Sequence, residues 1–236
     1  MTSLLAAIAV LFFASMLQSI TGSGFGLVAA PLLLMVDPDL VPGPLLVLTV
    51  VAMASVLWRD GRYCDLRTTV RLGIALLPGV LVGVWLISAV DPVVLTAVTA
   101  AMSIAAAVAA FAGARLPQRK SILTGAGALG GLMGVIAALP GPPLALAYAP
   151  DDRRTLRATL SVYFLAVSVV SLIMLHVAGG AEVFDWRSMA VLAPAVALGG
   201  ATGGRIANRI SVSGARRVTS LVILIAGSVL LVRTVA

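Results

Sequence analysis

Two short segments of the chain combine helix-breaking residues with groups that can donate hydrogen bonds. The first break is residues 18–26 (QSITGSGFG) and the second break is residues 138–143 (ALPGPP). The glycines of the first and the prolines of the second disfavour a continuous helix. A helix that restarts after such a break presents free amide N–H groups, carrying about half a positive charge, to a ligand. The pattern predicts that the two breaks together bind a small anion.

Side chains beside the breaks extend this set of donors. The amides at Phe25–Leu27 and near Leu144 are expected to face the ligand, and the prolines suit a first helical turn. The candidate substrate-binding residues are Gln18, Thr21, Gly22, Ser23, Gly24, Phe25, Gly26, Pro140, Gly141, Pro142, Pro143 and Tyr163. For Tyr163, packing is an equally good interpretation. For the breaks, the alternative is a pair of kinks whose hydroxyls bond back to helical carbonyls.

The composition places these segments inside a membrane. Of 236 residues, 61% are apolar and 11% are charged, against roughly a quarter charged in soluble domains. This excludes a soluble enzyme, a nucleic-acid binder and a disordered chain. A single cysteine and a single histidine, Cys64 and His176, offer neither an internal disulfide nor a metal site of Cys or His, so we expect no cofactor. The chain is predicted to be a polytopic membrane protein.

Charged residues mark the ends of the apolar segments. We predict an all-α fold of about eight spans, or ten if half-helices are counted. The apolar runs are residues 1–36, 41–58, 72–90, 92–113, 121–150, 158–175, 188–204 and 212–232. No predicted span holds Asp, Glu, Lys or Arg in its interior, because Arg216 and Arg217 lie at the edge of the last span, within the connection at 205–217. Proton relays and cation transporters usually keep an intramembrane carboxylate, so this pattern disfavours them.

The second half of the chain repeats the first. A shift of 117 positions pairs Gly24 with Gly141, and a later shift of 120 pairs Asp65 with Asp185. The repeats are expected at residues 1–113 and 121–236, joined by a cytoplasmic linker at 114–120. Each half also contains two glycines spaced by four positions, which are expected to allow close helix packing. They are Gly79 and Gly83 in the first half and Gly199 and Gly203 in the second.

Matching connections carry opposite charge. Residues 59–71 hold four arginines and their partner, 176–187, holds one, whereas 205–217 hold four and their partner, 88–92, none. By the positive-inside rule, matching connections lie on opposite sides, which predicts inverted repeats with loops 59–71, 114–120, 151–157 and 205–217 in the cytoplasm. Inversion needs an odd number of crossings per half. Each half is therefore expected to hold three spans and one hairpin of two short or half-length helices, at 3–36 and 121–150.

Three stretches carry a family resemblance. Residues 18–34, residues 130–143 with their GGLMG and PGPP motifs, and residues 157–164 (RATLSVYF) resemble the sulfite exporter TauE/SafE family. Ser23 and Phe25 interrupt the first glycine run, where family members often have a triplet. The resemblance implies a bacterial-type inner-membrane permease with about eight helices. It also implies export or uptake of sulfite, thiosulfate or small organosulfonates.

The sequence thus predicts a secondary transporter of a small anion, working by alternating access around the paired breaks. A passive anion channel is the alternative, and an intramembrane enzyme a weaker one, because the spans lack a carboxylate or a pair of metal ligands. The expected partners are a small anionic substrate and the lipid bilayer, with a coupling proton or cation and a homodimer left open. Arg153, Arg154 and Arg157 are interpreted as membrane anchors rather than anion guides.

Overall fold

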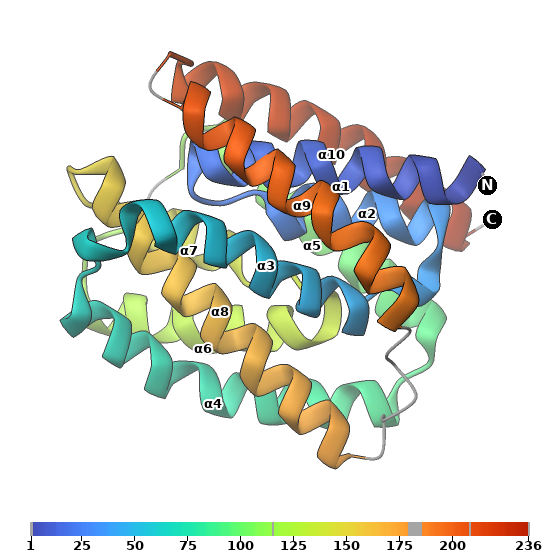
Figure 1. The fold of residues 1–236 in the computed structure, drawn as a ribbon. Coiled ribbons are helices and arrows are strands. Elements are labelled where there is room, and N and C mark those ends of the chain that lie inside the picture. Colours follow the sequence, from blue (N-terminus) through green and yellow to red (C-terminus); the bar gives the residue numbers. More distant parts are fainter. Residues whose placement is uncertain (1, 115, 179–185, 208, 236) are drawn as a thin grey trace.

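The computed structural model describes residues 2–114, 116–178, 186–207 and 209–235, and within them it contains helices and no strand (Figure 1). The first half comprises α1 (Thr2–Thr21), α2 (Phe25–Val36), η1 (Pro38–Leu40), α3 (Gly43–Asp60), η2 (Gly61–Tyr63), α4 (Leu66–Ala89) and α5 (Pro92–Phe111). The second comprises α6 (Lys120–Ala137), α7 (Gly141–Ala147), α8 (Arg153–Val177), α9 (Trp186–Ile206) and α10 (Val212–Val235).

Most of these helices can cross a membrane. In the described part of the chain, seven are long and apolar enough: α1, α3, α4, α5, α6, α8 and α9. The eighth expected span is α10, whose apolar stretch is Arg217–Val232, and α2 is a shorter apolar helix. The predicted all-α membrane fold is confirmed.

Each half opens with a helical hairpin, but only one arm of each hairpin is short. The leading helices α1 and α6 have 20 and 18 residues, whereas α2 has 12 and α7 has 7. The expectation of two short arms is corrected here. Nothing before Gly22 or Ala138 interrupts the apolar helix, so the first arm continues over the full thickness of a bilayer. Both breaks therefore lie between a complete helix and a partial one.

Glycines allow the closest helix contacts in the bundle. A Cβ added at Gly79 of α4 would overlap the carbonyl oxygen of Ala128 in α6, and one at Gly199 of α9 would overlap that of Phe12 in α1. A Cβ added at Gly83 would overlap the Val135 side chain of α6, and one at Gly203 would overlap the carbonyl oxygen of Met16 in α1. Such small residues let two backbones approach in a membrane, and the predicted packing role of these glycines is confirmed.

The helix contacts recur when the two halves are exchanged. The pairs α3–α8 and α5–α10 each join corresponding helices, and α4–α6 corresponds to α9–α1 (Figure 1). This pattern is compatible with a repeated, inverted architecture. It also means that the halves interlock, because each of these pairs takes one helix from each half.

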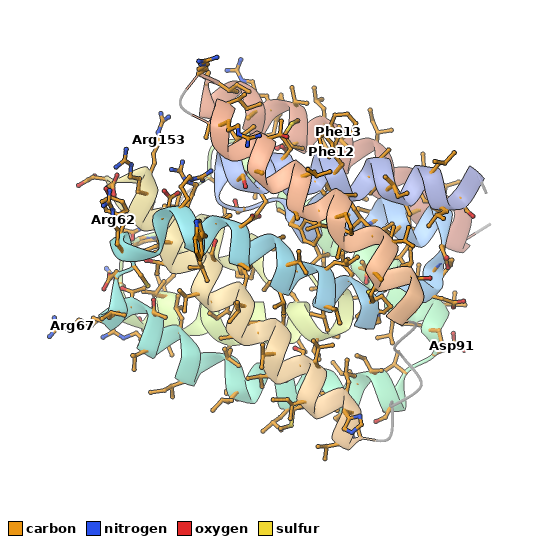
Figure 2. All side chains as sticks on the ribbon, in the orientation of Figure 1. Phe12, Phe13, Arg62, Arg67, Asp91 and Arg153 are labelled. Carbon is orange, nitrogen blue, oxygen red and sulfur yellow. The ribbon has the colours of Figure 1, made fainter. Side chains whose placement is uncertain are left out.

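Three arginines gather at one end of the bundle. Arg62, Arg67 and Arg153 lie at one end and Asp91 lies at the opposite end (Figure 2). Between them, the outer face of α4 exposes Ile74, Leu81 and Trp85. Apolar side chains on an outer surface between two charged ends are typical of a helix that faces lipid.

Candidate functional site

The two breaks contact each other directly. A Cβ added at Gly26 would overlap the carbonyl oxygen of Ala138, and one added at Gly141 would lie 4.0 Å from the Cβ of Ser23. Ala138 has a left-handed backbone (φ 54°), which ends α6 and turns its carbonyl toward the first break. Gly26 and Ala138, which are 112 positions apart in the sequence, are thus brought together at one place.

Gln18 organises the first break. Its Oε1 accepts the N–H of Phe25 at 3.1 Å, and its Nε2 donates to the carbonyl of Gly22 at 3.0 Å. One amide that was expected to face a ligand is therefore occupied by the protein itself. The amides of Gly26 and Leu27 have no hydrogen-bond partner among the described residues. These two N–H groups are the donors that the first turn of α2 leaves available.

The hydroxyl of Thr21 bonds to backbone carbonyls of its own segment, as the interpretation of the break as a kink expects. Its Oγ1 lies 2.8 Å from the carbonyl of Leu17 and 2.7 Å from that of Ser23, so the hydroxyl hydrogen is used within the break. The Ser23 hydroxyl, in contrast, has no partner in the described part of the chain. The break thus contains both a structural hydroxyl and one that remains available.

A cavity of about 40 Å³, here called the hydroxyl cavity, lies where α2, α5, α7 and α10 meet. The polar and break residues that line it are Thr21, Ser23, Pro142, Thr219 and Ser220. Apolar residues complete the wall, and no lining residue is charged. The hydroxyl cavity therefore offers hydrogen bonds without a fixed charge.

A second cavity, the break cavity, lies between the two breaks themselves. Its walls include Gln18, Gly24, Phe25, Gly26, Pro140 and Gly141, together with Thr49 and Met53 of α3 and Phe164 of α8. Its volume of about 20 Å³ has room for roughly one water molecule. The breaks are therefore closed upon each other, and a larger ligand requires them to separate.

Three predicted site residues line neither cavity. Tyr163 is buried, and its hydroxyl donates to the carbonyl of Gly127 at 2.6 Å, which is a packing contact between α8 and α6. Pro143 also lies outside both cavities. Gly22, with φ 82°, lies against Arg157 instead. The other nine predicted residues line one cavity or the other.

The family comparison covers nearly the whole chain. The model of the sulfite exporter TauE/SafE family matches residues 7–230, which include both breaks. The chain belongs to the sulfite exporter TauE/SafE family. TauE/SafE proteins are membrane transporters of the sulfite and sulfonate exporter type, which implies a small anionic substrate and a non-enzymatic role. No curated protein and no solved structure matches the chain.

Sequence reasoning missed the side chains that α10 and α3, which lie outside the breaks, contribute to the walls of these two cavities in the TauE/SafE chain. Thr219 and Ser220 come from α10, and Thr49 comes from α3. One signal was present in the sequence. The repeat shift of 120 positions pairs Thr219 with Thr99 of α5, so a threonine recurs at the matching place in both halves. Both hydroxyls bond back one turn, to Ala215 and Leu95 respectively, each at 2.8 Å.

A buried ion cluster lies beside the first break of this TauE/SafE protein. Arg157 Nε donates to Asp60 Oδ2 at 2.7 Å, and Arg59 Nη2 approaches the same oxygen at 3.1 Å. The side chains of Arg157 and Asp60 are only 7% and 5% exposed. This corrects the interpretation of Arg157 as a surface anchor. Because α8 begins at Arg153, Arg157 falls in its second turn and faces the bundle interior.

A much wider opening lies at the acidic end. A cavity of about 790 Å³ is bordered by Asp37 and Asp39 and by Thr96 and Thr99 of α5. It is open to the outside, whereas the cavities at the breaks are small. Of these three cavities, the one at the acidic end of the TauE/SafE bundle is thus by far the widest.

Proposed function

We propose that the protein is a secondary transporter that carries a small sulfur-containing anion, namely sulfite, thiosulfate or an organosulfonate, across the cell membrane. The observation that carries the proposal is the contact between the two breaks at Gly26 and Ala138. Non-helical backbone in a membrane bundle is tolerated where it is buried in protein or lines a cavity, and paired breaks are typical of transporter substrate sites.

The chemistry of the cavities supports an anion. The amides of Gly26 and Leu27 and the hydroxyl of Ser23 have no partner in the described chain, and all of these groups can donate. An oxyanion can accept several hydrogen bonds from such donors, and the partial charge at the start of α2 adds to the attraction. Because no charged residue lines either cavity, a bound anion is not trapped by a full counter-charge.

Alternating access explains why the cavities are small. An anion of several heavy atoms does not fit a space for one water molecule, so transport requires the breaks to separate. We propose that the halves are inverted repeats, as their exchanged helix contacts support. Since α1 packs on α9 and α4 on α6, the bodies that move are bundles mixed from both halves, and the breaks lie between them.

We propose that the arginine-rich end faces the cytoplasm and that the membrane is the inner membrane. The support is the segregation of Arg62, Arg67 and Arg153 from Asp91 (Figure 2). In this orientation the wide acidic cavity opens on the other side.

The test is sulfite flux into proteoliposomes, measured for Gly141→Leu and Gly141→Ala. A Cβ at Gly141 would meet Phe164 at 3.5 Å, an ordinary van der Waals distance, so alanine fits without strain. Leucine adds a larger side chain to the break cavity. We expect flux to be lost in the leucine variant and retained in the alanine variant, with both proteins folded.

Unchanged flux in folded Gly141→Leu protein would contradict the assignment of the site. Saturable counterflow of labelled sulfite separates a carrier from a passive anion channel, which shows none. Repeating the flux with the proton or cation gradient collapsed identifies a coupling ion.

A further inference from the structure

The ion cluster of Arg59, Asp60 and Arg157 is not balanced. It contains two guanidinium groups and one carboxylate, so it carries a net positive charge beside the first break. Arg157 uses Nε for Asp60, and its two terminal nitrogens have no partner among the described residues. The side chain is 7% exposed, and neither terminal nitrogen belongs to the fully buried polar atoms of the described chain that lack a partner, so both keep some access to solvent. Donors of a cation that are neither paired nor closed off are available to an anion.

A second unfilled group lies on the same face of α8. Ser161 follows Arg157 by four residues, so the two side chains lie one helical turn apart on one face. Ser161 is fully buried, and its Oγ has no hydrogen-bond partner in the described structure. Ser168 and Ser171 of α8 also lack a partner there. Of these three serines, Ser161 is the nearest to Arg157 along the helix. Two adjacent unfilled polar groups, one of them cationic, indicate a binding site for an anion.

The position of the cluster connects it to the breaks. A Cβ added at Gly22 would lie 2.9 Å from Cγ of Arg157, so the arginine stem rests on the backbone of the first break. Arg59 donates to the carbonyl of Ser19 at 3.2 Å, near the end of α1. Thr21 and Ser23, on either side of Gly22, line the hydroxyl cavity. The cluster is therefore separated from that cavity only by the break.

We propose that Arg157 and Ser161 form an anion station beside the first break, and that Asp60 is an internal counter-ion that the transported anion displaces from Arg157. This inference rests on the proposed function. The planar guanidinium can bind two oxygens of an oxyanion, and the serine hydroxyl supplies a third donor. When the anion arrives, Asp60 keeps its contact with Arg59, so no carboxylate is left unpaired.

The test is the dissociation constant of sulfite for purified full-length protein, from ligand-induced thermal stabilisation at constant ionic strength. Asp60→Asn removes the carboxylate that competes with sulfite for Arg157, and we expect sulfite to bind at least about fivefold more tightly. Arg157→Lys keeps the charge but loses the planar fork, and we expect binding about tenfold weaker or worse. Arg154→Gln is the control, because Arg154 is an exposed cation on the same helix that contacts Tyr63. We expect it to change binding less than about twofold.

The two variants shift affinity in opposite directions, which a purely structural cluster would not do. If Asp60→Asn leaves affinity unchanged or weakens it in folded protein, the station is wrong. If one variant fails to fold, the direction in which sulfite affinity changes in the other variant decides. A wild-type protein that neither binds nor transports sulfite or thiosulfate would overturn the proposed function itself. A wild-type protein that binds sulfite, with variants whose affinity is unchanged, would overturn only the anion station.

Discussion

Gly26 lies so close to the carbonyl oxygen of Ala138 that the smallest side chain does not fit between them. We expect Gly26→Ala to push the two breaks apart and to cost about 1–3 kcal/mol, the usual range for overpacking a buried contact. Thermal melting in detergent measures the stability, and sulfite flux measures the function. Both are expected to fall.

The matched control is Gly125→Ala, in α6, where an added Cβ meets nothing within 4 Å. Alanine is the better helix former by roughly 1 kcal/mol, so this variant should be at least as stable as the wild type. Equal melting temperatures for the Gly26 and Gly125 variants would show that the breaks do not depend on this contact.

Gln18→Leu tests the hydrogen bonds that hold the first break. The change leaves the N–H of Phe25 and the carbonyl of Gly22 without their side-chain partner in a buried place. Unpaired buried groups cost about 1–3 kcal/mol each, so we expect a clear fall in the free energy of unfolding. Gln118→Leu, in the exposed linker, is the control and should have little effect. A Gln18 variant as stable as its control would refute the structural role.

Tyr163→Phe separates packing from substrate binding. Because the hydroxyl donates to Gly127 and lines neither cavity, its loss should lower stability by about 1 kcal/mol and leave the KM for sulfite unchanged. Flux measured over a range of sulfite concentrations gives the KM. A raised KM at unchanged stability would instead place this hydroxyl in the substrate site.

Asp65→Ala removes the N-cap of α4. The carboxylate accepts the hydroxyl of Thr68 at 2.6 Å and its amide at 3.2 Å, and the Thr68 hydroxyl is the main reason that the pKa of Asp65 lies below its usual value. A lowered pKa means that the stabilisation is present at neutral pH and is lost as the pH falls through that pKa. We expect a loss of about 1 kcal/mol at pH 7.

The difference between this variant and the wild type should shrink below about pH 4, as the carboxylate protonates. Melting temperatures between pH 3 and pH 7 check this. A difference that does not change with pH would mean that the charge of Asp65 is irrelevant to the cap.

The sequence predicted the membrane class, the helical fold and the two breaks because these follow from local composition. Glycine, proline and charged residues mark where helices end whatever the tertiary contacts are. The contributions of Thr219 and Thr49 depend on which helices become neighbours, which local pattern does not contain. Arg157 was misjudged for the same reason. An arginine near a helix start resembles a membrane anchor until its partner, Asp60, is known to lie opposite.

The interlocked glycine contacts have a consequence for how the protein is made. While only the first half has been synthesised, α1 and α4 lack the partners α9 and α6 against which their backbones pack. The early helices must therefore remain in the bilayer without these partners, and lipid covers Gly79 and its neighbours until the later helices are inserted. Final assembly of the bundle is thus a late step, and a chain whose synthesis stops midway lacks the helix contacts that complete the core.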